Sequence, residues 1–127
     1  MSKTTDHVID NLNQFKMEFH ESKLNSEGPK RALVDIDETI CRYEGKRRYD
    51  LSIPLYKNIE KINRMYDNGW EIIYWTARGA VSGVDYRKHT LKQLKEWGCK
   101  FHDLMIGNKP HFDLVIDDKA KRIEEIN

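Results

Sequence analysis

Acidic and hydroxyl side chains stand directly after three of the short apolar runs in this sequence. The first run is followed by Asp35, Asp37 and Thr39, the second by Thr76, and the last by Asp117 and Asp118, with Lys109 just before that last run. Four carboxylates brought together would repel one another unless a cation lay among them. Mg²⁺ suits such a set better than zinc, because it prefers a few carboxylates, waters and a substrate phosphate.

The elements that must position these residues are predicted by an alternation of strand-length and helical segments. Strands are expected over residues 31–36, 70–75, 101–106 and 112–116. One helix is expected to open at Ser52–Pro54 and end at Gly69, and another to open at residues 82–85 and end at Gly98. This order predicts an α/β fold with a mostly parallel sheet of about four strands flanked by helices. Right-handed crossovers would gather the carboxyl ends of the strands along one edge, where such sheets bind ligands.

The N-terminal segment has a pattern of its own. Val8, Leu12, Phe15 and Phe19 recur at helical spacing, and residues 25–29 then interrupt the pattern. Residues 1–28 are therefore predicted to form a helical extension ahead of a single domain, residues 29–127. The apolar stripe of this helix needs cover, either from the sheet edge of its own chain or from a second copy in a homo-oligomer. The sequence leaves both open.

Composition excludes several classes of protein. The chain has 127 residues, 22 Lys and Arg against 21 Asp and Glu, and a formal charge of +1, so the total charge calls for neither nucleic acid nor an anionic membrane. No apolar run approaches 18 residues. The two cysteines, Cys41 and Cys99, lack CxxC spacing, which favours reduced thiols in a cytoplasmic protein.

The order of these motifs resembles that of the haloacid-dehalogenase-like (HAD) phosphohydrolase superfamily, across residues 31–120. The Asp-x-Asp-x-Thr motif is DIDET at 35–39, followed by Thr76, Lys109 and the acidic pair. The phrases WTARG, QLKEWG and KPHFDLVIDDKA are most similar to small bacterial phosphatases assigned to capsule or surface-polysaccharide sugar metabolism. Glu38 departs from the pattern, since many family phosphatases have Gly there.

The resemblance implies a Rossmann-like HAD fold and a mechanism. Asp35 would attack phosphorus to form an aspartyl-phosphate, and Asp37 would protonate the leaving oxygen and then activate water. Thr76 and Lys109 would hold the phosphoryl group. The implied metal ligands for Mg²⁺ are Asp35, Asp37, Asp117 and Asp118.

The same resemblance bears on the substrate. The intervals after Thr39 and Thr76 are too short for a cap domain, so a capless phosphatase is expected. Arg78 and Thr39 are expected to contact the substrate. The flap, residues 41–51, carries Arg42, Lys46, Arg47 and Arg48, which either grip a second anionic group or form a solvated hairpin.

The leading hypothesis is a Mg²⁺-dependent phosphomonoesterase for a small phosphorylated metabolite, such as a sugar phosphate. One alternative is a phosphatase for nucleotides or nucleic-acid ends, favoured by an open site and a basic flap. The other is a phosphate-binding module without catalysis, which the intact Asp35 and Asp37 argue against.

Overall fold

The structure, a computed structural model, describes residues 28–110 and 112–127. The chain divides into two units, Met1–Lys30 and Arg31–Asn127, and the second carries all the elements described below. The helix predicted within residues 1–28 lies outside the described residues. In the part of the chain that is described, no helix has the length and apolar character needed to cross a membrane.

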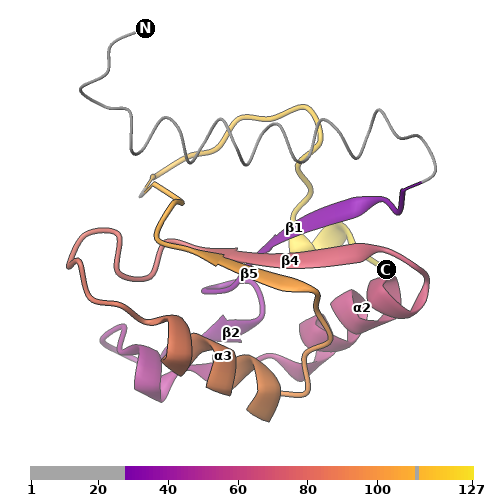
Figure 1. Cartoon of the computed structure of the whole chain (residues 1–127). Coiled ribbons are helices and arrows are strands. Elements are labelled where there is room, and N and C mark those ends of the chain that lie inside the picture. The colour runs from indigo at the N-terminus through magenta and orange to yellow at the C-terminus, as the bar shows by residue number, and fades with distance from the viewer. Residues whose placement is uncertain (1–27, 111) are drawn as a thin grey trace, which may run out of the picture. The chain divides into compact units, whose positions relative to one another are not determined.

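A three-stranded parallel sheet forms the centre of the second unit (Figure 1). Its strands are β1 (Arg31–Asp35), β4 (Glu71–Thr76) and β5 (Asp103–Ile106), in the order β1-β4-β5. The register pairs Asp35 with Trp75 and Thr76 with Ile106, so all three strands end at nearly the same level. The fold is thus α/β and mostly parallel, which is compatible with a Rossmann-like arrangement.

Within the described residues, helices α2 (Tyr56–Asp67) and α3 (Arg87–Glu96) lie on one face of this sheet (Figure 1). The reason is topological: the strand order steps in one direction, and right-handed crossovers then place successive helices on the same side. Two short antiparallel strands, β2 (Cys41–Arg42) and β3 (Ile53–Pro54), form a separate pair. Short 3-10 helices occur at Tyr49–Leu51 (η2) and Ile123–Glu125 (η3).

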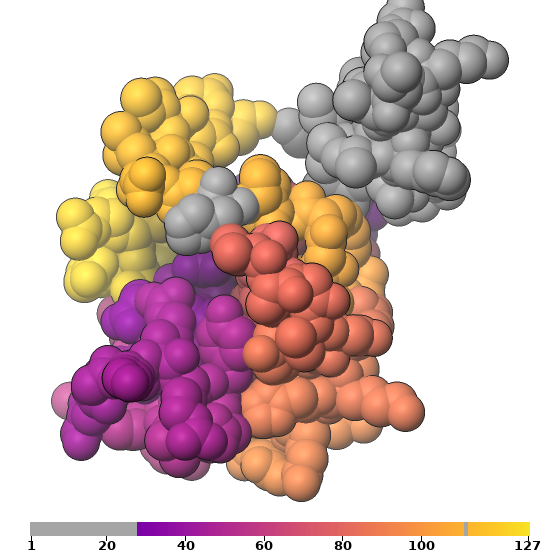
Figure 2. All heavy atoms as spheres, turned by 90° about the vertical axis from the view of Figure 1, so that its left-hand side faces the viewer, coloured from indigo at the N-terminus to yellow at the C-terminus, as the bar shows by residue number. Residues whose placement is uncertain are grey.

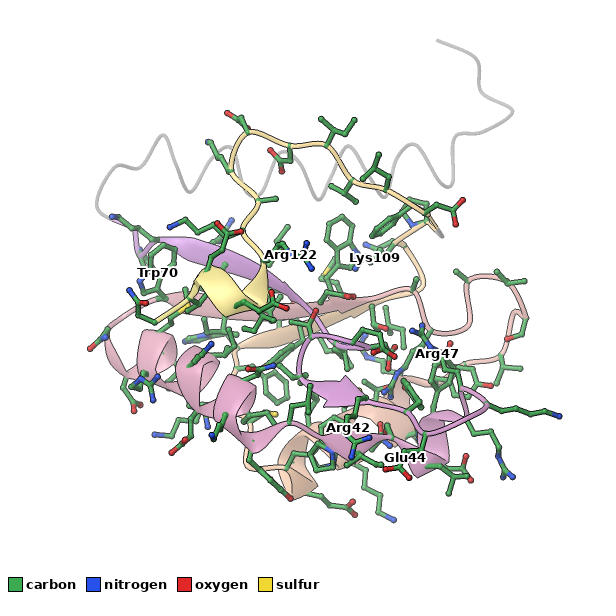
Figure 3. All side chains as sticks on the ribbon, turned by 180° about the vertical axis from the view of Figure 1, so that it is seen from behind. Arg42, Glu44, Arg47, Trp70, Lys109 and Arg122 are labelled. Carbon is green, nitrogen blue, oxygen red and sulfur yellow. The ribbon has the colours of Figure 1, made fainter. Side chains whose placement is uncertain are left out.

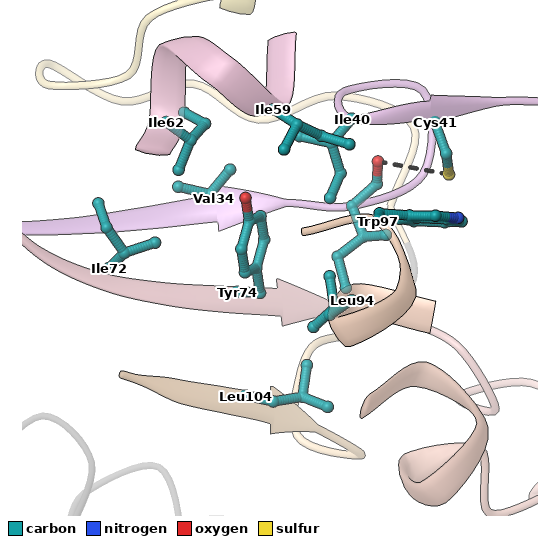
Figure 4. Close-up of a cluster of buried hydrophobic side chains, with 11 residues drawn as sticks. Val34, Ile40, Cys41, Ile59, Ile62, Ile72, Tyr74, Leu94, Trp97 and Leu104 are labelled. Carbon is teal, nitrogen blue, oxygen red and sulfur yellow. Dashed lines mark hydrogen bonds between the residues drawn. The ribbon is translucent and has the colours of Figure 1, made fainter. Parts of the chain in front are cut away.

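The core lies between the sheet and these helices (Figure 4). Its fully buried members include Ile72, Leu94 and Leu104, one each from β4, α3 and β5. Strand residues alternate across the sheet, so the neighbours of Val34 and Tyr74 face away from this core. Leu33 on β1, for example, is exposed.

Both cysteines are free thiols, as the sequence predicted. Burial, reinforced by the nearby charge of Asp37, raises the pKa of Cys41 to about 12. Burial likewise raises the pKa of Cys99 to about 11. Both side chains are therefore protonated and uncharged at neutral pH.

The prediction of a fourth strand over residues 112–116 is wrong, because residues 112–118 have no regular structure. Their apolar side chains, Phe112, Leu114, Val115 and Ile116, are between 43% and 89% exposed. A further parallel strand would have to begin at the opposite edge of the sheet from the end of β5. Such a return takes a crossover of about a dozen residues, and only residues 107–111 separate Ile106 from Phe112.

Helix α2 begins later than predicted. Ser52–Pro54 does not open it, because Ile53 and Pro54 pair with Arg42 and Cys41 as strand β3. Helix α2 starts at Tyr56. The residue before it, Leu55, donates its N–H to the Ile40 carbonyl at 2.8 Å. This pairing anchors the flap beside the first turn of α2.

A glycine next to the candidate site provides a test of the backbone geometry. Gly79 has φ +83°, and a Cβ added there would lie 2.1 Å from the Val84 carbonyl oxygen. Gly83 has a similar φ of +75°, with nothing within 4 Å of its added Cβ. We expect Gly83→Ala to lower the free energy of unfolding by about 1 kcal/mol, and Gly79→Ala by about 3 kcal/mol or more. Urea unfolding measures both, and equal losses would contradict the clash.

Candidate active site

The segments that follow the three parallel strands gather on one face of the unit, shown in Figure 2. The purple segment after β1 lies beside the salmon segment after β4, and the orange segment after β5 lies above them (Figure 2). These segments carry Asp35, Asp37, Arg78 and Lys109, which come together there through hydrogen bonds and ion pairs.

Asp35, at the end of β1, forms an ion pair with Lys109. The Lys109 Nζ donates to Asp35 Oδ1 at 2.7 Å and to the Trp75 carbonyl oxygen at 3.3 Å. The lysine side chain is 8% exposed, whereas the carboxylate is 44% exposed. Lys109 also lies 5.4 Å from the Trp75 ring centroid and 5.3 Å from that of Phe112. Asp35 is thus a partly exposed carboxylate beside a buried lysine. Lys109 is labelled in Figure 3.

A tight turn connects Asp35 to Asp37 and to the flap. The N–H groups of Thr39 and Ile40 both bond the Ile36 carbonyl, at 3.0 and 2.9 Å. Within this turn Glu38 has φ +67°, a left-handed conformation that costs a side-chain residue free energy and that glycine adopts readily. The strain of this conformation therefore falls on a non-glycine residue. The Thr39 hydroxyl lies 3.5 Å from Asp35 Oδ2.

Asp37 is held by Arg78, whose side chain is completely buried. The Nε of Arg78 donates to Asp37 Oδ2 at 3.1 Å, and its Nη2 donates to Asp37 Oδ1 at 2.9 Å. The same Nη2 lies 3.4 Å from the Tyr43 hydroxyl. On the other side, Nη1 donates to Gln93 Oε1 at 2.6 Å and to Thr90 Oγ1 at 3.2 Å. The five N–H groups of the guanidinium thus have five acceptors within the protein.

This differs from the prediction that Arg78 contacts the substrate. Its donors are all engaged by protein atoms, and its guanidinium lies over the ring of Tyr49, 4.7 Å from the centroid. A phosphate oxygen would have to displace one of these acceptors. The physical reason for the difference is burial: an arginine sealed from water must find partners for every donor, and Asp37 and helix α3 supply them.

The contacts of Asp37 determine its charge. Burial raises the pKa of Asp37, and the hydrogen bond and positive charge of Arg78, together with hydrogen bonds from Tyr43 and Cys41, outweigh burial and bring it below its ordinary value. For Arg78, burial lowers the pKa and Asp37 raises it, with a net increase. At neutral pH the pair is therefore a carboxylate and a guanidinium. In the free protein Asp37 has the form that accepts a proton.

Thr76, the last residue of β4, is almost completely buried. Its hydroxyl lies 3.5 Å from Asp37 Oδ2, and its oxygen accepts a hydrogen bond from the Arg78 N–H at 3.2 Å. The predicted phosphate-binding hydroxyl is thus directed to Asp37 and to the turn that follows β4. It stands within the same network as Arg78.

The basic residues of the flap are paired with neighbouring acids. Arg42 bonds Glu44 at 3.2 Å, Arg47 bonds Glu38 at 3.3 Å, and Arg48 bonds Asp50 at 3.0 Å. Arg42, Glu44 and Arg47 are labelled in Figure 3. Lys46 is exposed. Of the two interpretations that the sequence left open, these ion pairs favour the solvated hairpin.

The structure does not bring the predicted acidic pair to Asp35 and Asp37. Asp117 and Asp118 lie in an exposed bend, where Asp117 Oδ1 accepts a hydrogen bond from the Lys119 N–H at 3.1 Å. In residues 28–110 and 112–127, no three His, Cys, Asp or Glu side chains form a group that could hold a metal ion. As placed, Asp117 and Asp118 do not complete a Mg²⁺ site with Asp35 and Asp37. The short connection after β5 explains the separation, because it prevents a fourth strand that would carry Asp117 to the edge.

Sequence reasoning missed three polar residues of the site: Tyr43 on the flap and Thr90 and Gln93 on α3. Tyr43 donates a hydrogen bond to Asp37 Oδ1, and Gln93 Nε2 donates to the Tyr49 carbonyl and to Ser52 Oγ. A signal did exist, since Thr90 and Gln93 share the helical face of Leu94 and Trp97. Polar residues on a buried helical face require a partner of opposite hydrogen-bonding character.

Fold and site together define an α/β protein with a carboxylate-rich edge at the ends of parallel strands. No family model matches the chain, and no curated protein matches it. Among solved structures, a structural-genomics target from Vibrio cholerae is similar, with a TM-score of 0.68 and 22% sequence identity over 76% of this chain and 86% of that one. That similarity shows a shared fold.

Proposed function

We propose that this protein is a HAD-like, capless phosphomonoesterase that acts on a small phosphorylated metabolite, such as a sugar phosphate. The observation that carries the proposal is the pair formed by Asp35 and Lys109. A carboxylate left 44% exposed at the end of a parallel strand can approach a phosphate, and a buried ammonium 2.7 Å away can offset the charge of the phosphoryl group.

In the first half-reaction, an oxygen of Asp35 attacks phosphorus and the bond from phosphorus to the leaving oxygen breaks. Asp37, in its neutral form, gives its proton to that oxygen, and an alcohol departs. Asp37 is an anion in the free protein and takes up this proton from solvent as the substrate binds. The approach of a phosphate dianion favours the neutral form, because a second negative charge beside a carboxylate raises its pKa.

In the second half-reaction, water attacks the phosphorus of the aspartyl-phosphate. The water loses a proton to the Asp37 carboxylate, the bond to Asp35 breaks, and inorganic phosphate leaves. Asp35 is then a free carboxylate again and Asp37 is again neutral, so protons and charges balance over the cycle. Lys109 stabilises the phosphoryl oxygens in both halves.

Mg²⁺ is the cofactor that we expect for this phosphatase. When bound in such a site it screens an anionic nucleophile from a phosphate dianion. Asp117 and Asp118 lie apart from Asp35, and the steps above use only Asp35, Asp37 and Lys109. The ion pairs of the flap engage Arg42, Arg47 and Arg48 with neighbouring acids, which supports a small phosphate ester over nucleic-acid ends as the substrate.

The test is a screen for release of inorganic phosphate. Sugar phosphates, nucleotides and oligonucleotides phosphorylated at the 5′ or 3′ end are each incubated with the full chain, once with Mg²⁺ and once with EDTA. We expect turnover of a sugar phosphate in Mg²⁺ and its loss in EDTA. Faster turnover of the oligonucleotides would reverse the ranking of substrates. Background release from every compound in Mg²⁺ would overturn the proposed function.

A further inference from the structure

The connection between Asp37 and helix α3 has no counterpart in the roles predicted from the sequence. The guanidinium of Arg78 contacts both oxygens of Asp37 on one side and two side chains of α3, Thr90 and Gln93, on the other. Gln93 continues the connection to the flap through the Tyr49 carbonyl and Ser52 Oγ. The position of the Asp37 carboxylate is thus linked to a rigid helix.

A carboxylate that must exchange a proton with a leaving oxygen and then with water needs a defined orientation. An arginine supplies this through two parallel hydrogen bonds from a planar group, which a lysine, with a single point of charge, does not reproduce. Burial strengthens the effect, because the Arg78 side chain is completely buried and the Asp37 side chain is only 9% exposed. Thr90 and Gln93 in turn determine the plane of the guanidinium.

We propose that Arg78 is the positioning residue of this site and orients Asp37 for proton transfer. This inference rests on the proposed function. If Asp37 loses its orientation, hydrolysis should become slower for esters whose leaving oxygen needs a proton. Hydrolysis should change little for esters whose leaving group departs as a stable anion.

The experiment compares phenyl phosphate, which needs the proton, with 2,4-dinitrophenyl phosphate, which does not. For Arg78→Lys we expect kcat/KM to fall about 10²-fold on phenyl phosphate and less than about tenfold on the dinitrophenyl ester. Thr90→Val removes one acceptor of Arg78 and keeps the shape of the side chain. It should also lower kcat/KM more on phenyl phosphate than on the dinitrophenyl ester, by a smaller factor, and it replaces Arg78→Lys as the test if that variant does not fold. Arg87→Lys is the matched control. Arg87 is exposed, and its ion pair with Asp103 is long at 4.0 Å, so this variant should leave the hydrolysis rates of both esters unchanged.

A double variant distinguishes positioning from a general structural role. Once Asp37→Asn has removed proton transfer, adding Arg78→Lys should cost little more on phenyl phosphate, because the two residues act as one unit. Equal losses on the two esters, or full additivity in the double variant, would overturn the positioning role while leaving the phosphatase proposal in place. A wild-type protein inactive on both esters and in the metabolite screen would overturn the proposed function, and this inference with it.

Discussion

Asp35→Asn is expected to abolish turnover and leave the protein folded. An amide is not a nucleophile toward phosphorus, so no aspartyl-phosphate can form, and the expected loss in kcat is at least about 10⁴-fold. Stability should change little, because Asp35 is 44% exposed and Lys109 retains the Trp75 carbonyl as an acceptor. Release of phosphate measures turnover, and circular dichroism with thermal melting measures the fold.

The matched control for this variant is Asp67→Asn. Asp67 also pairs with a lysine, Lys100, at 2.9 Å, but both side chains are about half exposed on the surface. It should retain wild-type turnover. The nucleophile can also be identified directly, by mass spectrometry of a quenched reaction, in which the phosphorylated peptide should contain Asp35. Near-wild-type rates for Asp35→Asn, or a label on another peptide, would rule out the proposed mechanism.

Asp37→Asn is expected to lower kcat by about 10²–10⁴-fold on an ester with a poor leaving group. The amide cannot give or accept the proton that both half-reactions require. In this variant Arg78 also loses its counter-charge in a buried position, so the melting temperature should fall. Phenyl phosphate hydrolysis measured well below the melting temperature isolates the chemical effect. A kcat within a few-fold of wild type would remove Asp37 from the mechanism.

Most of the elements could be predicted from the sequence because their signals are local. The two strands β4 and β5 form close to their predicted positions, and α3 ends where Gly98 interrupts the helical pattern. Residues 52–54 were predicted to open a helix, but a serine followed two residues later by proline is also compatible with a short strand. Only the pairing with Cys41 and Arg42 decides between the helix and the strand. The strand expected at 112–116 did not form because β5 lies at one edge of the sheet, a strand order that local patterns do not show, and the five residues after it are too few for a return to the other edge.

The candidate site divides in the same way. That Asp35 and Thr76 would stand at strand ends followed from apolar runs and the geometry of parallel sheets. Lys109 reaches Asp35 across 74 positions of sequence, and no local pattern predicts that contact. The burial of Arg78 was not predicted for the same reason, since a basic residue two positions past a strand end looks accessible until the tertiary structure is known.

By itself, the sequence determined the alternation of strands and helices, the parallel sheet and the position of Asp35 and Thr76 at its carboxyl edge, because hydrophobic periodicity and turn residues act over a few neighbouring positions. Only the tertiary structure decided which of those residues meet. Arg78 turns to Asp37, 41 positions away, because burial against α3 leaves its donors no water and a carboxylate is the best acceptor within reach. Asp117 and Asp118 stay apart because five residues cannot carry the chain back across the sheet.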